Sequence, residues 1–276
     1  MATGDLTTLA NVKTFLALGT STADDATLTR FVHEHSRAIL DYLQRPSLVS
    51  TAFQEMRDGK GTSSAFLPNW PVTSVQSVVI DGKFQPPAPT LNGVPIGPGF
   101  FLEPWDGCSA GGPQKLSIIG GRCGFSVGCM NILIAYTAGY LVSAEAQTVP
   151  DAAPYQLTAL QDLGPWSADG GVAYANGTQF VTVPSAPGQG QYSVAAGVYT
   201  FNAADAGQAV ILAYSYTPAT VEDACISWIA ERYKYRGRIG VRSKAIGDGQ
   251  TESYDLSDVP AYIKTQLQQY RKVLPL

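Results

Sequence analysis

The spacing of the hydrophobic residues changes twice along this chain, and the change limits the folds open to it. Near both ends apolar residues recur at helical intervals, as at Leu28, Val32 and Ile39. In the middle the apolar runs are short and have a period of two, as over 132–137, which is typical of strands. We therefore expect an α+β fold, in which the N- and C-terminal helices pack as a small bundle with a β region between them.

Two helices are expected before residue 46. Thr7 or Thr8 can cap a short first helix, because a hydroxyl oxygen accepts a hydrogen bond from a free N–H of the first turn. Its expected apolar side is Leu9, Val12, Phe15 and Leu16. Asp24 and Asp25 introduce a longer second helix. Pro46 ends it, because proline cannot continue the hydrogen-bond ladder.

Strands joined by turns are expected from about residue 52 to residue 140. Dipeptides that tolerate the positive φ of tight hairpins mark the turns: Asp58-Gly59, Asp81-Gly82, Asn92-Gly93 and Asp106-Gly107. Residues 143–164 are rich in Ala, Gln and Pro and are expected to form a connector. A second β block follows, with candidate strands at 180–183, 191–194, 197–201 and 209–216.

Helix returns after residue 218. Thr220 to Asp223 resembles a capping box, in which a hydroxyl and a carboxylate satisfy free N–H groups of the first turn. The expected face of this helix is Val221, Ala224, Cys225, Trp228, Ile229 and Arg232. A Gly-containing link is expected over 237–249. A last helix has Pro260 in its first turn, and its apolar stripe is Val259, Ile263, Leu267, Tyr270 and Leu274.

Two segments, 132–140 and 210–217, resemble each other as strands of Ile, Leu, Ala and Tyr. Either could lead into the helix near Thr220, so the simplest account is that residues 143–217 were inserted between a strand and its following helix. Chance similarity between two β-rich segments is the alternative. The expected domains are a core of 1–142 and 218–276, a connector of 143–164 and an inserted all-β domain of 165–217.

The composition excludes several classes of protein. With 276 residues, 45% of them hydrophobic, the chain can bury a core without disulfides and is not intrinsically disordered. Charged residues are only 14%, against about 25% in typical domains, which favours a surface covered by partners. No signal peptide or membrane-spanning run is visible, so we expect reduced cysteines, and we expect no metal or other cofactor.

The charges are unevenly distributed along the chain. Residues 123–231 contain eight acidic side chains and no Lys or Arg, and a basic run over 232–244 follows. This asymmetry favours an interaction surface, the alternative being a solvated basic face. Only Tyr233 and Tyr235 could stack on bases there, so the run fits an acidic protein surface or the lining of a DNA path better than specific nucleic-acid recognition.

The sequence offers no catalytic constellation. Gly124–Gly128 matches the nucleophile-elbow pattern around Ser126, but an elbow needs a following helix and a downstream histidine. Here a strand pattern follows, and the only histidines, His33 and His35, lie upstream. We therefore expect that the protein is not an enzyme.

The order of elements resembles that of the head–tail connector (adaptor) proteins of tailed bacteriophages. Residues 6–16 and 24–43 look like the paired N-terminal helices of that family. Further similar segments are 70–82 and 135–140 in the β region and 224–240 and 267–271 in the C-terminal helices. Compact members lack the block at 143–217, and its part over 190–216 resembles a small β module of other phage structural proteins.

The resemblance implies a structural virion protein, made in the host cytoplasm, that forms a ring between portal and tail and continues the DNA channel. Implied partners are the portal protein, a tail, tail-terminator or stopper protein, and other copies of the chain in a dodecameric ring. DNA would pass without specific contacts, and no membrane is involved. The family's C-terminal part meets the portal, so the candidate portal-binding residues are Arg232, Tyr235, Arg236, Arg238, Arg242 and Lys244.

The alternative function is that of a β-module binding protein of the phage tail, which would recognise a glycan or a receptor. Candidate residues for lining a sugar site are Trp105, Trp166, Tyr174 and Tyr199. Tyr and Trp are at least as often core or interface residues.

Overall fold

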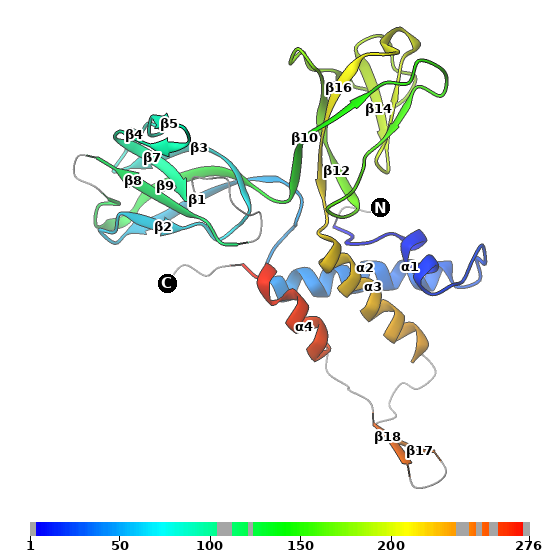
Figure 1. Cartoon of the computed structure of the whole chain (residues 1–276). Helices are drawn as coiled ribbons and strands as arrows, with labels where there is room; N and C mark the ends of the chain where they lie inside the picture. Colours follow the sequence, from blue (N-terminus) through cyan, green and yellow to red (C-terminus); the bar gives the residue numbers. More distant parts are fainter. Residues whose placement is uncertain are drawn as a thin grey trace. The chain divides into compact units, whose positions relative to one another are not determined.

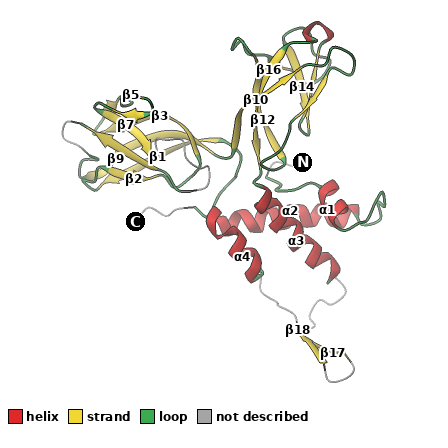
Figure 2. Cartoon of the chain, in the orientation of Figure 1, coloured by secondary structure: helices red, strands yellow, loops and turns green. Residues whose placement is uncertain are grey.

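The structure is a computed structural model. It describes residues 4–103, 112–120, 124–235, 243–246, 250–253 and 259–272. The chain divides into two compact units (Figures 1 and 2). The helical unit comprises 1–46, 160–167 and 217–271, and the β unit comprises 47–159, 168–216 and 272–276. Helices and antiparallel sheets in one chain confirm the predicted α+β class.

The two N-terminal helices begin where their capping residues predict. Helix α1 spans Leu9–Phe15, and the Thr8 hydroxyl accepts a hydrogen bond from the Asn11 N–H at 3.1 Å. Helix α2 spans Asp25–Leu43 and ends at Gln44, which has a left-handed backbone, two residues before Pro46. The predicted apolar side of α1 is partly wrong, because Val12 is buried whereas Phe15 is 58% exposed.

Helix α3 spans Ala219–Lys234, and α4 spans Ala261–Leu267 with a 3-10 turn over Gln268–Tyr270. The predicted capping box at Thr220 is wrong. Pro218 is the N-cap residue, and no side chain caps this end. Residues 243–246 and 250–253 form an antiparallel ribbon, β17 and β18, where a link was expected. Arg232, expected to close the apolar face of α3, is exposed.

The helices from the two ends of the chain contact one another, since α3 packs on α1, α2 and α4. The Leu6 N–H donates to the Ser36 hydroxyl at 2.9 Å, and the ring of Trp228 meets the edge of His35 at 4.6 Å between centroids. The buried apolar side chains of this unit include Val12, Leu28, Ile39, Leu43, Val221, Ala224, Ile229, Ile263 and Leu267.

The first lobe of the β unit has two antiparallel sheets and a ribbon. The four-stranded sheet runs in the order β1 (Thr51–Gly59), β9 (Gly128–Ala138), β3 (Val72–Ile80), β4 (Lys83–Gln85). The three-stranded sheet is β2 (Ser64–Phe66), β8 (Lys115–Ile119), β7 (Gly99–Glu103). The ribbon pairs β5 (Thr90–Leu91) with β6 (Val94–Pro95).

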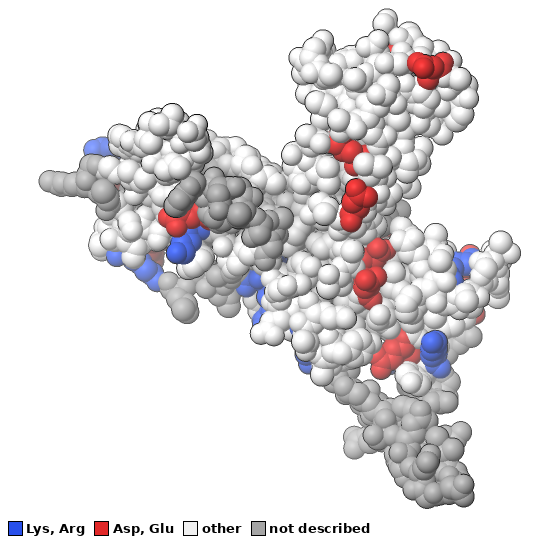
Figure 3. Space-filling view, viewed as in Figure 1, with Lys and Arg blue, Asp and Glu red and all other residues white. Residues whose placement is uncertain are grey.

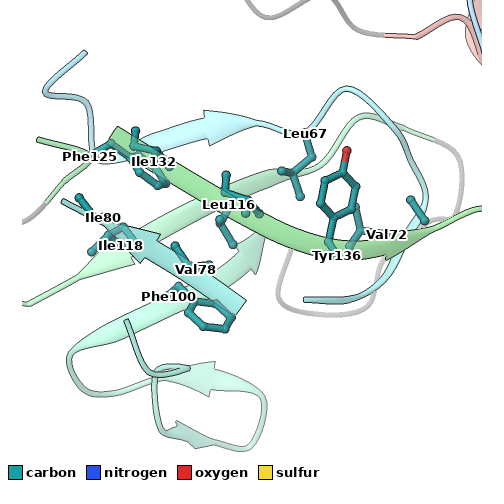
Figure 4. Close-up of a cluster of buried hydrophobic side chains, with 12 residues drawn as sticks. Leu67, Val72, Val78, Ile80, Phe100, Leu116, Ile118, Phe125, Ile132 and Tyr136 are labelled. Carbon is teal, nitrogen blue, oxygen red and sulfur yellow. The ribbon is translucent and has the colours of Figure 1, made fainter. Parts of the chain in front are cut away.

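One hydrophobic cluster forms the core of this lobe (Figure 4). Alternate residues of β9 point into it, because successive side chains of a strand face opposite sides. Ile132, Ile134 and Tyr136 are accordingly buried. They meet Val78 and Ile80 from β3, together with Leu67, Phe100, Leu116, Ile118 and Phe125. The predicted strand over 132–140 is confirmed over 132–138, since β9 ends at Ala138.

Two of the predicted turn dipeptides of this lobe form hairpin turns, and one does not. Asp81-Gly82 joins β3 to β4 and Asn92-Gly93 joins β5 to β6, all four with positive φ as predicted. Asp58-Gly59 is not a turn but the end of β1. Glycine is needed there because a Cβ at Gly59 would lie 1.7 Å from the Ser126 carbonyl oxygen. Asp106-Gly107 lies outside the described residues.

The second lobe also has two sheets. One is β10 (Leu141–Thr148), β16 (Ala209–Tyr216), β12 (Trp166–Tyr174), and the other is β11 (Gln156–Thr158), β15 (Val198–Phe201), β14 (Gln191–Ala195), β13 (Val181–Thr182). The four predicted strands of the second block are all present. Residues 143–164, expected to be a connector, contain most of β10 and all of β11.

Buried carboxylates in this lobe accept hydrogen bonds from tyrosines. Glu145 is 8% exposed and accepts from the Tyr214 hydroxyl at 2.5 Å. Asp205 is 1% exposed and accepts from the Tyr174 hydroxyl at 2.7 Å. These two acids of the stretch 123–231, which has no Lys or Arg, are therefore structural and are not part of an acidic surface. On the face drawn in Figure 3, the second lobe shows Asp and Glu but no Lys or Arg.

Candidate partner-binding surface

The C-terminal end of α3 is held in place by contacts to the start of α2. The Tyr233 hydroxyl donates to the Asp24 carboxylate at 2.5 Å. The Tyr235 N–H donates to the Glu231 carbonyl at 3.0 Å and closes the last turn. Because the Tyr233–Asp24 contact joins residues 209 positions apart, the end of α3 has a defined place on the helical unit.

A hollow of about 340 Å³ opens beside this end of α3. It is lined by Phe15 from α1, by Ser227, Ala230, Glu231, Lys234 and Tyr235 at the end of α3, and by Tyr262 from α4. Phe15, Tyr235 and Tyr262 are 58%, 39% and 46% exposed, so three aromatic rings meet solvent around one depression. Exposed aromatic side chains around a hollow are typical of protein-binding surfaces.

One polar contact fixes the wall of the hollow. The Tyr262 hydroxyl donates to the Glu231 carboxylate at 2.8 Å and ties α4 to α3. Burial raises the pKa of Tyr262, and the contact with the Glu231 carboxylate raises it further. The phenol therefore stays protonated and remains a donor at any physiological pH. Lys234 on the same rim is exposed and adds a positive charge.

The structure describes only part of the predicted portal-binding set. Tyr235 lines the hollow, whereas Arg232 is exposed in the last turn of α3 and does not line it. Arg236, Arg238 and Arg242 lie outside the described residues. The backbone of Lys244 is paired with that of Glu252 in the β17–β18 ribbon.

Sequence reasoning missed Phe15 and Tyr262. The helical period placed Phe15 on the buried side of α1, but α1 ends at that residue and leaves its ring exposed. Tyr262 directly precedes the buried Ile263 and so points away from the core. An aromatic residue next to the apolar stripe of a helix is a weak sequence signal for a binding surface. These residues form one surface only because α1, α3 and α4 pack together.

A second, more polar hollow of about 300 Å³ lies in the second lobe. Its lining is Tyr174, Asn176, Thr178, Gln189, Ala204, Asp205 and Gln208. Burial, followed by the hydrogen bond to Asp205, raises the pKa of Tyr174 to about 12. Tyr199, another candidate for a sugar site, is fully buried, and Trp105 lies outside the described residues.

The motif around Ser126 has a structural role in the loop before β9. Ser126 donates to the Asp81 carboxylate, and Asn131 donates to the same carboxylate at 2.9 Å. A strand follows the motif, as expected. Among the described residues, no group of three or more His, Cys, Asp or Glu could hold a metal ion. In the same residues, no helix has the length and apolar character to cross a membrane.

Comparison with known proteins links the first third of the chain to one family. Residues 5–89 match the family model described as head completion protein. This match covers α1, α2 and strands β1 to β4, and confirms the predicted resemblance to phage head–tail connector proteins over that part.

The chain was also compared with curated proteins and with solved structures. No curated protein matches the chain significantly. A chain in a solved structure, titled virion of native gene transfer agent (GTA) particle, aligns over 100% of this chain and 98% of its own length. The sequence identity is 14% and the TM-score is 0.37.

Proposed function

We propose that this chain is a structural protein of the phage virion, related to the head completion proteins, which assembles as a ring between portal and tail and continues the DNA channel. The match of residues 5–89 to the head completion family carries the proposal and supports the predicted location in the virion. The protein acts by binding, and no catalytic step is part of the proposal.

The portal contact is assigned to the aromatic hollow and the basic segment that follows it. Tyr235 lies in the hollow and directly precedes residues 236–244, which contain Arg236, Arg238, Arg242 and Lys244. An apolar side chain of the portal would enter the hollow, while portal carboxylates pair with the guanidinium groups. Arginine suits this task because its planar group binds a carboxylate through two parallel hydrogen bonds.

Co-purification with the portal protein tests this assignment. Reversing Arg236, Arg238 and Arg242 to Glu, or separately changing Tyr235 to Ala, should abolish binding and leave the helical circular dichroism unchanged. The three arginines follow the end of α3 in the sequence, and Tyr235 is exposed, so its side chain contributes little to stability. Arg30→Glu is the control, since Arg30 is 71% exposed on α2 and pairs with Glu34 one turn further along the helix. If the triple variant binds the portal with wild-type salt dependence, the assignment is wrong.

We further propose that the second lobe is an insertion in the core. The first and last strands of the lobe lie side by side, since Leu141 is paired with Ser215 and the Tyr216 N–H donates to the Tyr140 carbonyl at 3.2 Å. Deleting 144–217 and joining the ends should leave a folded, helical remainder. Loss of the whole helical signal in circular dichroism would contradict the insertion.

The second candidate function, glycan binding by a tail component, is favoured by the polar hollow of the second lobe. Amide side chains, a hydroxyl and a tyrosine around one depression are groups that recognise sugars, because they offer donors and acceptors beside an apolar ring. Negative-stain microscopy distinguishes the two functions. Rings on a co-expressed portal support the first, and dispersed monomers that bind glycans support the second.

A further inference from the structure

An apolar row crosses the outer face of the four-stranded sheet. The register places Met56 of β1 opposite Leu133 of β9, Leu133 opposite Val79 of β3, and Val79 opposite Phe84 of β4. Directly opposed residues of antiparallel strands lie on the same face of a sheet. The four side chains therefore form one continuous line across all four strands, and it is called the apolar row below.

The apolar row is on the side of the sheet away from the core. Its neighbours along β9 are the buried Ile132 and Ile134, which face the cluster drawn in Figure 4. Met56 and Phe84 are 53% and 60% exposed. On one side of the row the same face is neutral, since the register aligns Gln54, Ala135 and Ser77; on the other side Asn131 binds the Asp81 carboxylate. A continuous apolar line on a solvent-facing sheet indicates a surface that another molecule covers.

A second apolar surface lies on the β5–β6 ribbon of the same lobe. Leu91 is paired with Val94, and the Ile96 N–H donates to the Pro89 carbonyl at 2.9 Å, which places these two residues opposite each other as well. Leu91, Val94 and Ile96 are 61%, 46% and 63% exposed. Since the two pairs lie on one face, this ribbon face is apolar over its length. Residues 84–102 contain no charged side chain.

We infer that the apolar row of one copy of this chain binds the β5–β6 ribbon of the next copy. The two surfaces are alike in size. Scaled from the 150–250 Å² that an aromatic residue buries, each exposes on the order of 250 Å² of apolar side chain, about a third of the ~800 Å² that one partner contributes to a standard interface. That area suits the apolar centre of an interface, which is depleted of charge.

The inference rests on the proposed ring. A ring needs two different surfaces on each copy, because a surface that binds its own copy stops at a dimer. The row and the ribbon are two such surfaces in one lobe. Neither has charges that an acidic or basic partner would need, so a second uncharged surface of this chain fits them better than DNA or a charged protein.

Variants of the full-length chain test the inference through sedimentation and native mass spectrometry over a range of concentrations. Met56→Glu with Phe84→Glu places two charges in the apolar row, and Leu91→Glu with Ile96→Glu places two charges on the apolar ribbon face. Each double variant should weaken self-association at least about tenfold, since buried apolar residues at an interface centre act as hot spots. Gln54→Glu and Thr90→Glu are the controls, because each adds one negative charge at an exposed position of β1 or β5 that belongs neither to the apolar row nor to the apolar ribbon face.

Mixing the two double variants gives the sharpest result. The row-defective chain keeps its ribbon and the ribbon-defective chain keeps its row, so the mixture should form a one-to-one dimer that cannot grow, while each variant alone is monomeric. Three outcomes overturn the inference: a wild-type chain that stays monomeric at all concentrations, variants that associate like wild type, or a mixture that stays monomeric. Portal binding by a monomeric wild type would leave the proposed function intact.

Discussion

Glu222 joins the two ends of the chain and gives the sharpest test of the helical packing. Its carboxylate accepts hydrogen bonds from the Thr7 hydroxyl at 2.8 Å and from the Asn11 side-chain amide at 2.6 Å. Thr7 is fully buried, whereas the contact with Asn11 is exposed. Removing the carboxylate would therefore leave a buried hydroxyl without its acceptor.

The expected loss for Glu222→Ala is about 2–3 kcal/mol. A hydrogen bond to a charged group contributes about 1.5–3 kcal/mol when buried, and an exposed one contributes less. A negative charge in the first turn of α3 adds roughly 0.3–1 kcal/mol through the helix dipole. Asp223→Ala is the control, because it removes an exposed carboxylate from the same end of α3 and should cost only this smaller amount.

Denaturant unfolding followed by helical circular dichroism measures both variants. A double-mutant cycle with Thr7→Val should give a coupling of about 1–2 kcal/mol, within the roughly 0.5–3 kcal/mol found for residues in direct contact. If Glu222→Ala costs no more than Asp223→Ala, or if the cycle gives no coupling, the contact does not hold the N-terminal segment on α3.

Three further predictions concern stability. Ile134→Ala should lower the free energy of unfolding of the first lobe by about 2–5 kcal/mol, measured with denaturant. Val127→Ala, at an 81% exposed position, should change this free energy by less than about 0.5 kcal/mol. Equal effects of the two substitutions would contradict the assigned core. Gly59→Ala should lower the free energy of unfolding by about 1–3 kcal/mol, because the added methyl group overpacks against the Ser126 carbonyl. Gly112→Ala should leave it unchanged, because a Cβ there meets nothing within 4 Å. An unchanged stability for Gly59→Ala would refute the close approach. Burial lowers the pKa of His35 below its usual 6.5, so below about pH 6.5 the unfolded chain binds more protons than the folded one and the helical unit loses stability. His35→Gln should reduce that loss between about pH 7 and 5 in thermal unfolding, and an unchanged pH profile would contradict the buried neutral ring.

The sequence predicts the elements whose signals are local. The α2 boundaries follow from Asp25 and Pro46, and the Asp81-Gly82 and Asn92-Gly93 hairpins follow from residues that accept positive φ. Strand β10 is missed because its inward residue Glu145 is charged, so the hydrophobic alternation is absent. Hydrogen bonds from Tyr214, 69 residues away, and from Gln147 satisfy this buried carboxylate.

The candidate surface was predictable only in part, for the same reason. The basic run pointed to the segment after α3 and so included Tyr235. Phe15 and Tyr262 join it from α1 and α4, and no sequence pattern relates residues about 250 positions apart. Likewise, the apolar row depends on the register of four strands, which links Met56 to Phe84 only through β9 and β3.

The neighbouring entry and exit of the second lobe have a mechanical consequence. Because Leu141 and Ser215 face each other at the base of β10 and β16, tension along the chain reaches the lobe across a single rung of the antiparallel pair. Such a load would peel hydrogen bonds one at a time from that rung and would not shear the strands past each other. While the rung holds, tension applied between Tyr140 and Tyr216 is borne by this rung and not by the strands beyond it.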